Sequence, residues 1–535
     1  MPTETWLYAS LHRRSPSQFV RGSWYNNRSN AEVKATGMRK VNIIGSGVAG
    51  LSTGCYLQMN GYETQIFEAH NLPGGVCTAW KRKGYTIDNC IHWLVGSSPS
   101  DSFYRLWNEL VDMKSRKFVD SEEWMRVETP DGRYMRVFTD IDRLEQEMLE
   151  KSPSDERLIR SFTGAARRFI GFHLPVEKAP ELFGPMDGLK MILGLLPFML
   201  PLRKWVGISM QQYADKCRDP LLKRTFESMF TPETNVLFVL MTIVWMHKKS
   251  AGFPIGGSLE FARQIEKRYL ELGGKINYRS RVAKISVKND AATGIVLASG
   301  EEHASDIVVS AADGHSTIFD MLDGRYIDAK IKSYYDSYET FPSYLLVSFG
   351  VARRFDDYPR AIILFPEQLL TTDRVSKYEG VMVRIFGFDP TLAPEGKTVI
   401  TVWILTREHE YWDNLKRTAP EQYKAEKNRI AEEVLELLEK RFGDIRSKVE
   451  MTDVCTPATF MRYTSNWKGS FEGWLWTPKV GLRGMVKVLP GLDNFYMAGH
   501  WVEPGGGLPT AMKSGRDVAQ IICRKDKKRF TTSRF

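Results

Sequence analysis

The sequence predicts an α/β protein in which a discontinuous, parallel-sheet domain carries an inserted α+β domain. A buried strand, a glycine-rich turn and a helix follow one another at residues 41–60. Strands and helices alternate again at 251–313 and at 494–522. Strands that alternate with helices favour a parallel sheet. The chain between them is long enough to form the inserted domain.

Composition narrows the class of protein. With 43% apolar and 26% charged residues in 535, the chain is typical of a globular protein that is too long for one core. The net charge of +10 is spread along the chain without a helix-turn-helix or zinc spacing, so we predict no nucleic-acid partner. Six cysteines without a CxxC pair, and nine histidines without a metal spacing, predict no metal and a reducing, cytoplasmic environment.

The two ends of the chain differ from the rest. Residues 1–37 are rich in arginine and poor in acids, which is also the composition of a transit segment. Because the first strand begins just after this stretch, we interpret 1–37 as a disordered or dispensable extension and infer no organelle from it. Residues 526–535 form a short basic tail.

The turn after the first strand carries the pattern GxGxxG. The first glycine allows a tight turn, the second lets a pyrophosphate approach the backbone, and the third lets the helix pack closely on the strand. Free N–H groups at the start of the helix then face the phosphates. We therefore predict a Rossmann-like dinucleotide site that includes Gly45, Ser46, Gly47, Val48, Ala49 and Gly50.

An acidic residue follows the second predicted strand, "ETQIF". Glu68 lies at about the spacing at which a carboxylate accepts a hydrogen bond from a ribose hydroxyl. An acid at this position favours an unphosphorylated ribose, as in FAD or NAD. We assign Glu68 and the adjacent Ala69 to the cofactor site.

The next motifs distinguish between these two cofactors. "PGG" at 73–75 and "GYTIDNCIHW" at 84–93 make the chain resemble the FAD-binding domain of the amine oxidase and phytoene desaturase superfamily. The resemblance implies FAD as the cofactor, with Gly74 and Gly75 continuing the diphosphate cradle. Members commonly carry an arginine after this pair, whereas this chain has Val76, which leaves the basic run 81–83 as a hypothetical source of positive charge.

Two later blocks extend the resemblance. Residues 251–313 follow the order of the superfamily, which implies a backbone contact from Val282 to the adenine. In the third block a strand ends at Gly499, and a glycine run precedes a helix that begins near Pro509. Such a helix N-terminus stabilises the negative charge of a reduced flavin. The predicted cofactor residues of this block are Gly499, Gly505, Gly506 and Gly507.

The resemblance covers three separated blocks of the chain, which implies that the FAD-binding domain is discontinuous. We assign 38–105, 251–325 and 485–525 to the FAD-binding domain, and 106–250 and 326–484 to the substrate domain. The runs 343–351 and 397–405 predict strands, and 140–250 is mostly helical in pattern. A sheet floor under a helical roof would enclose an apolar tunnel.

Two apolar runs, 191–202 and 235–246, are followed by basic and aromatic residues. Both are shorter than the roughly 18 to 20 residues that a membrane-spanning helix needs. Two interpretations stay open for each run: a buried helix or pocket wall, and a segment that touches a membrane interface.

Within the superfamily, the motifs "GYTIDNCIHWLVGS", "GFPIGGS" and "AGHWVEPGGGLP" resemble the phytoene desaturase, carotenoid isomerase and retinol saturase branch. The resemblance implies an FAD-dependent oxidoreductase acting on a lipophilic unsaturated substrate, such as a carotenoid, a retinoid or another isoprenoid polyene. Desaturation, saturation and isomerisation all stay open, as does transient electron delivery by NAD(P)H.

Flavin hydride chemistry asks little of side chains, so no catalytic triad is needed, and the catalytic residues stay unassigned. The motifs place His92, Trp93, His500 and Trp501 nearest the flavin or the substrate. Either histidine could exchange a proton, and either could simply be held by backbone hydrogen bonds. The two tryptophans could line the pocket or pack in the core.

Two alternative functions are weighed against this hypothesis. One is a flavin amine oxidase that acts on a soluble amine. The other is a flavin-free chaperone for prenyl lipids, because proteins that resemble the Rab GDP-dissociation inhibitors use a related fold. Glu68, Gly74, Gly75 and the glycines at 505–507 favour a flavin enzyme over such a chaperone.

Overall fold

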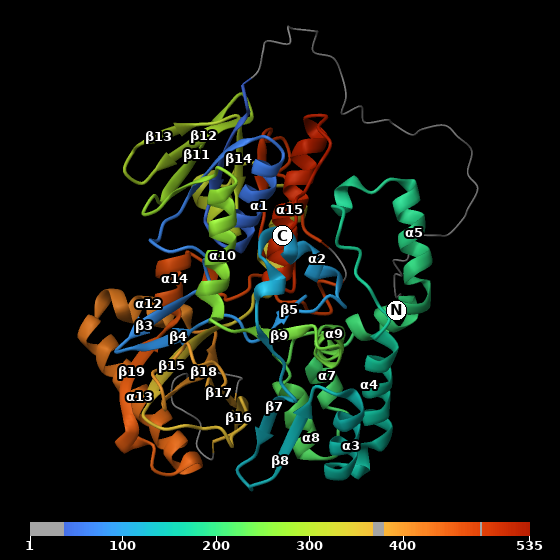
Figure 1. The fold of residues 1–535 in the computed structure, drawn as a ribbon, viewed down its shortest axis with the longest axis vertical. Helices are drawn as coiled ribbons and strands as arrows, with labels where there is room; N and C mark the ends of the chain where they lie inside the picture. The colour runs from blue at the N-terminus through green and yellow to red at the C-terminus, as the bar shows by residue number, and fades with distance from the viewer. Residues whose placement is uncertain (1–36, 367–378, 482–483) are drawn as a thin grey trace. The chain divides into compact units, whose positions relative to one another are not determined.

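The computed structural model describes residues 37–366, 379–481 and 484–535, and from Met38 onward they form one compact unit (Figure 1). The extension predicted over 1–37 lies outside the described residues, apart from Gly37.

A five-stranded parallel sheet joins the three predicted blocks. Its order is β10-β2-β1-β14-β20, and each pair of neighbours is parallel. The strands are β1 Lys40–Ile44, β2 Glu63–Phe67, β10 Lys275–Asn277, β14 Ile307–Ser310 and β20 Phe495–Met497. Parallel strands covered on both faces are apolar along their length, and all four residues of β14 are buried. The predicted parallel sheet is confirmed.

Three helices lie together beside this sheet: α1 Val48–Met59, α10 Gly257–Glu271 and α15 Leu508–Lys525. In Figure 1 α1 lies between the other two and contacts both. A Cβ atom at Gly515 of α15 would lie 2.6 Å from the carbonyl oxygen of Ala49. Glycine at this position therefore lets α15 approach the first turn of α1 closely.

The second large sheet is mixed and seven-stranded, with the order β19-β15-β18-β17-β16-β7-β8. Only the β16–β7 pair is parallel. The predicted strands at 343–351 and 397–405 are confirmed as two antiparallel neighbours, β15 and β18. The strands are β7 Glu123–Glu128, β8 Tyr134–Phe138, β15 Ser343–Val351, β16 Ala361–Leu364, β17 Val381–Ile385, β18 Thr398–Thr406 and β19 Val449–Cys455.

Helices cover this mixed sheet. Alternate residues of β15, such as Leu345 and Val347, pack with α12 His409–Thr418 and α13 Pro420–Phe442, whereas Tyr344 belongs to the core on the other face. The helical prediction for 140–250 is confirmed. The helices there are α3 Ile141–Lys151, α4 Glu156–Phe169, α5 Pro185–Leu195, α6 Met199–Val206, α7 Met210–Ala214, α8 Pro220–Ser228 and α9 Val236–His247.

Short elements link the two sheets. Strand β9 pairs with β5 on one side and with β6 on the other, so it connects stretches that we assigned to different domains. The boundary positions themselves stay predictions. The remaining elements are β3 Ala79–Arg82, β4 Tyr85–Asp88, β5 Leu94–Val95, β6 Phe118–Val119, β9 Ala251–Pro254, β11 Val282–Lys288, β12 Ala291–Leu297, β13 Glu302–Ala304, α2 Ser102–Leu110, α11 Ala329–Ser337 and α14 Pro457–Thr464.

The two apolar runs have different surroundings. The run 235–246 is α9, whose apolar residues are largely buried, so the buried interpretation holds there. The run 191–202 belongs to a helical segment, Pro185–Val206, that is long and apolar enough to cross a membrane yet only 6% buried. Two prolines and the charged residues Asp187, Lys190, Arg203 and Lys204 interrupt this segment.

The basic tail 526–535 packs on the first helices. Asp526 forms an ion pair with Arg39 at 2.5 Å, and the backbone N–H of Phe535 donates to the carbonyl oxygen of Asn108 in α2 at 3.1 Å. The tail is therefore held by specific contacts.

Candidate active site

A cavity of about 810 Å³ lies between the two sheets, within the size range of small-molecule sites. At one end it is lined by Ile44, Phe67 and Ala311, at or just beyond the carboxyl ends of β1, β2 and β14. At the other end it reaches Phe238 of α9. Ligands of open α/β sheets bind outside the carboxyl ends of the strands, so the cavity occupies the expected place.

The turn from β1 into α1 forms the first wall. Gly45 has φ +93°, a conformation that favours glycine, and its N–H donates to the carbonyl oxygen of Phe67 at 2.8 Å. A Cβ at Gly47 would meet nothing closer than the carbonyl oxygen of Gly74 at 3.9 Å, so this position is open to the cavity. Among the described residues no side chain caps α1. The first N–H groups of α1 are therefore available to an anion.

Two predicted cofactor residues lie behind this wall. Ser46 is fully buried and donates from its N–H and its hydroxyl to Glu68 Oε2, at 2.7 and 2.8 Å. A Cβ at Gly50 would lie 2.0 Å from the carbonyl oxygen of Gly45. Neither residue lines the cavity. Ser46 orients the acid, and Gly50 lets the helix approach the strand.

The ribose end of the cradle contains Glu68, Ala69 and Val282, which all line the cavity. Glu68 Oε1 accepts a hydrogen bond from the N–H of His70 at 2.8 Å, so both carboxylate oxygens are fixed by donors from the chain. A carboxylate has about four acceptor positions, and those left over suit the hydroxyls of a ribose.

The glycine pair closes the other side of the turn. The N–H of Gly74 donates to the carbonyl oxygen of Ser46 at 2.8 Å, and both Gly74 and Gly75 line the cavity. The hypothesis that the basic run 81–83 supplies charge here is wrong. None of its residues lines the cavity, because Arg82 pairs with Asp453 at 3.2 Å and Lys83 donates to the carbonyl oxygen of Glu450.

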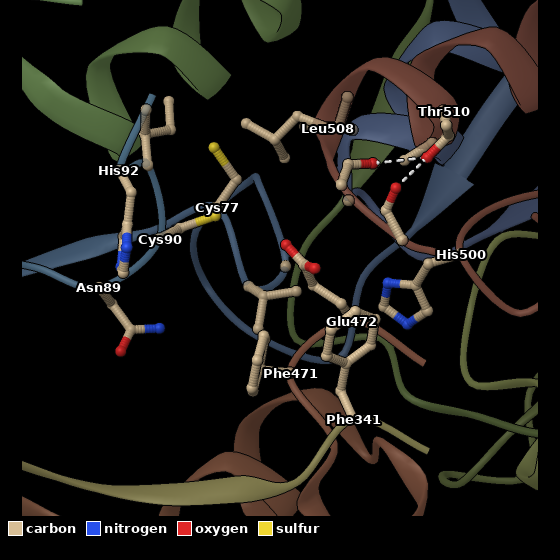
Figure 2. A pocket seen from close by; sticks show the side chains of 18 of the residues that line it. Cys77, Asn89, Cys90, His92, Phe341, Phe471, Glu472, His500, Leu508 and Thr510 are labelled. Atoms are coloured by element: carbon tan, nitrogen blue, oxygen red, sulfur yellow. Dashed lines mark hydrogen bonds between the residues drawn. The ribbon is translucent and has the colours of Figure 1, made fainter. Parts of the chain in front are cut away.

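A second helix N-terminus opens on the same cavity. Gly499 and the run 505–507 line it, and α15 begins directly afterwards. No described side chain caps this helix. Thr510 instead turns its hydroxyl back and donates to the carbonyl oxygens of Gly506 and Gly507 (Figure 2).

These features fit FAD. Two uncapped helix N-termini favour its diphosphate and the pyrimidine end of its flavin, glycines leave room for close approach, and Glu68 suits its ribose. The assignment of individual cofactor residues stays a prediction.

The two predicted histidines, His92 and His500, both line the cavity. Enclosure away from water lowers the pKa of His500 to about 4. The pKa of His92 lies well below its usual value, first because of desolvation and second because of the Arg384 charge. Both imidazoles are therefore neutral at pH 7. Among the described residues nothing hydrogen-bonds to His92 Nε2.

Aromatic side chains form the half of the cavity that is distant from the glycines. Trp93 makes edge contacts with Trp124 and Phe230, at ring-centroid distances of 5.6 and 5.7 Å. Tyr344 and Trp403 stack at 4.0 Å. Trp501 also reaches the cavity, although it is only 3% exposed and packs in the core. This half suits an apolar, elongated ligand.

Two charged residues of the cavity were missed by the sequence analysis, and the first is Arg384 of β17. It is 6% exposed and donates from Nη2 to the carbonyl oxygen of Ile91 at 3.1 Å, whereas its Nη1 has no hydrogen-bond partner among the described residues. Burial lowers the pKa of Arg384 to about 10. Its signal in the sequence was an arginine in the otherwise apolar strand "VMVRI".

The second missed residue is Glu472. Desolvation raises the pKa of its carboxyl group to about 8, and no described residue forms a hydrogen bond or an ion pair with it. A single acid among glycine and aromatic residues, in "GSFEGWLW", was the available signal.

Comparisons with known proteins agree with this geometry. The family described as "Flavin containing amine oxidoreductase" matches residues 48–523. The chain belongs to this family. As a flavin amine oxidoreductase it is an enzyme, and the family implies FAD.

Relatives of this flavin amine oxidoreductase align over most of their length. Prolycopene isomerase 2, chloroplastic, from an Oncidium hybrid cultivar is 26% identical, over 88% of this chain and 82% of the relative. The 4,4'-diapophytoene desaturase (4,4'-diapolycopene-forming) from Methylomonas sp is 25% identical, over 91% and 96%.

Solved structures share the fold of this flavin amine oxidoreductase. An oxidoreductase from Methanosarcina mazei matches with TM-score 0.58 and 18% identity, over 90% of this chain and all of the other. Cyclohexylamine oxidase from Brevibacterium oxydans matches with TM-score 0.56 and 13% identity, over 92% and 100%.

Proposed function

We propose that this flavin amine oxidoreductase acts on a lipophilic polyene, such as a carotenoid or a retinoid, which it desaturates, saturates or isomerises. The observation that carries the proposal is the aromatic half of the cavity, which lies opposite the glycine cradle. The names of the two relatives, a prolycopene isomerase and a diapophytoene desaturase, support it.

One half of the cavity would bind the cofactor, and the other half would bind the substrate. Glu68 and the N-termini of α1 and α15 would hold FAD, which supplies or takes a hydride when bound. The aromatic residues would align the polyene and exclude water from it. Trp93, Trp124 and Phe230 are rigid enough to do so without much loss of conformational entropy.

The two alternatives are less well supported. The guanidinium of Arg384, which hydrogen-bonds to the carbonyl oxygen of Ile91 beside His92, would repel a protonated amine from that part of the cavity. A flavin-free chaperone conflicts with membership of a family of flavin enzymes.

The proposed function is tested on purified protein loaded with FAD. We expect flavin absorbance in the protein and, under anaerobic conditions with reduced and oxidised flavin in turn, a change in polyene isomer or chain unsaturation by mass spectrometry. Release of hydrogen peroxide from amines, with no change in any polyene, would overturn the proposal. NAD(P)H, as a hypothetical donor, is tested by following flavin bleaching after it is added.

We also propose that the segment α5–α6 rests on an anionic membrane surface. Its apolar side chains face outward: Leu200 is 81% exposed, Met186 65% and Leu196 62%. Lys190, Arg203 and Lys204 supply the positive charge that anionic lipids attract. Leu174, in the connection that leads into α5, is both exposed and part of the cavity lining, so a membrane-dissolved substrate would enter beside it.

Lipid vesicles test this second proposal. We expect the protein to sediment with vesicles that contain anionic lipid, less with neutral vesicles, and less again at high salt. Absence of sedimentation with anionic vesicles would overturn it.

A further inference from the structure

Glu472 lies at the junction between the flavin cradle and the aromatic half. Figure 2 shows its carboxyl group directed into the space framed by Cys77, Phe471 and Leu508. A Cβ at Gly506 would lie 2.6 Å from Glu472 Cβ and 3.2 Å from its Oε2. The acid therefore packs directly on Gly506, just before α15, where the flavin is expected.

Within the described part of the chain, no cation forms an ion pair with this acid. Cys90 and Tyr344 interact with it electrostatically. A hydrogen bond with Cys77 and desolvation raise the pKa of Cys90, and desolvation raises the pKa of Tyr344, so both stay neutral. His500, which lies beside Glu472 in Figure 2, is also neutral at pH 7. A carboxylate would be a poorly solvated charge here, and the neutral acid is the favoured form.

Two other acids of the cavity, Asp313 and Glu68, have structural partners. Asp313 accepts hydrogen bonds from the N–H groups of Ser316 and Trp467, at 2.7 and 2.8 Å. Glu68 is fixed by Ser46 and His70. Glu472 has no such structural task.

We propose that Glu472 is the residue that exchanges a proton with the substrate carbon next to the one that gains or loses the hydride. The proposal rests on the proposed function. Saturation of a carbon–carbon double bond adds one hydride, which reduced flavin supplies, and one proton. The O–H bond of Glu472 breaks, and the π-electron pair of the double bond forms a C–H bond with this proton.

The remaining steps balance. Glu472 is left as a carboxylate and regains its proton from water. In desaturation the carboxylate takes the proton, and the electron pair of the broken C–H bond forms the double bond. Tyr344 and Trp403 line the same cavity, and aromatic rings near a polyene would favour positive charge that develops along it.

The protonation state of Glu472 predicts whether saturation or desaturation is favoured at each pH. Because the pKa of Glu472 is about 8, the proton-donating form dominates at pH 7. The rate of saturation should therefore fall as the pH rises through about 8, whereas the rate of desaturation should rise. The two histidines do not show this behaviour, because they are already neutral.

The experiment compares Glu472→Gln and Glu472→Asp with a surface control, Glu436→Gln on α13, in holoenzyme and apoprotein. Infrared spectroscopy of apoprotein should show the C=O band of a protonated carboxylic acid that disappears as the pH rises through about 8. Glu472→Gln should lack this band at every pH, and the control should retain it.

In holoenzyme, Glu472→Gln should lose about 100-fold or more in turnover, with unchanged flavin content and unchanged polyene affinity by tryptophan quenching. Glu472→Asp should recover part of the loss. Retained turnover in Glu472→Gln, or a band that titrates at the ordinary pKa of glutamate, would overturn the role of Glu472. A wild-type enzyme that changes no polyene would instead overturn the proposed function.

Discussion

The two ends of the cavity are built by different means. The cradle end uses main-chain groups: glycines without side chains, uncapped N–H groups of α1 and α15, and one acid fixed by neighbouring donors. The far end uses side chains from separate elements, including Trp93, Phe230 and Trp403. Main-chain chemistry is the same in every sequence that keeps the turn, whereas side chains can be exchanged one at a time. The cradle therefore fixes the cofactor, and the aromatic end is free to set the substrate.

The largest expected effect separates cofactor binding from folding. Gly47→Val should place a side chain in the open space of the cradle and weaken flavin binding by at least about 100-fold. The fold should survive, because the φ of −62° and ψ of 171° at Gly47 suit valine. Flavin content and circular dichroism check this.

Gly164→Val in α4, where a new Cβ meets nothing within 4 Å, is the control and should keep its flavin. A Gly47→Val protein with full flavin content would contradict the assignment of the cradle.

A change at the aromatic end should do the reverse. Trp93→Leu removes the edge contacts with Trp124 and Phe230, and we expect about 10-fold weaker polyene binding with normal flavin content. Fluorescence titration with a polyene measures it. Trp80→Leu, on β3 and outside the cavity, should leave polyene binding unchanged. If Trp93→Leu loses flavin instead, the division of the cavity into two ends is wrong.

Glu472, which lies between the two ends of the cavity, should change how the free energy of unfolding depends on pH. Glu472 keeps its proton up to about pH 8 when folded, whereas an unfolded chain releases it near pH 4.5. Between these values the unfolded state binds fewer protons, so the free energy of unfolding falls as the pH rises, by up to about 1.4 kcal/mol per pH unit. Glu472→Gln apoprotein should lack this part of the slope. Urea unfolding at pH 6, 7 and 8 compares the slopes, and equal slopes would contradict an enclosed neutral acid.

The smallest effect concerns the proposed membrane segment. Leu200→Asn removes one exposed apolar side chain from α6, and we expect vesicle affinity to fall by about 10-fold or less while soluble-phase flavin binding stays normal. Leu270→Asn, an exposed leucine on α10, is the matched control. Equal vesicle binding by both variants would contradict a contribution of Leu200 to membrane binding.

The cradle was predictable from sequence because its parts are local. GxGxxG, the acid after the second strand and the later glycine run each carry their signal within about twenty residues. Arg384 and Glu472 carry no such signal, because only the fold brings β17 and the segment after α14 to the same cavity. The role given to the basic run 81–83 failed because those residues lie on the β3–β4 hairpin and turn to Asp453 and Glu450.

Burial is the other property that could not be predicted from the sequence. The runs 191–202 and 235–246 have similar apolar composition, but α9 is enclosed by its neighbours and α5–α6 is not. Hydropathy describes a segment, whereas burial depends on what other segments cover it. His92 and His500 were located by motif, but their neutral state at pH 7 depends on burial that only the fold supplies.

Strand β9 is short, but its two partners limit how the molecule can move. By pairing with β5 and β6 at once, it ties the cradle side of the cavity to the substrate side through main-chain hydrogen bonds. Hinge opening would have to break this ladder. A ligand that enters without doing so must pass by rearrangement of side chains and loops. The rate of substrate binding would then depend on a few gating side chains. Solvent viscosity should lower this rate less than it lowers the rate in enzymes whose domains close over the substrate.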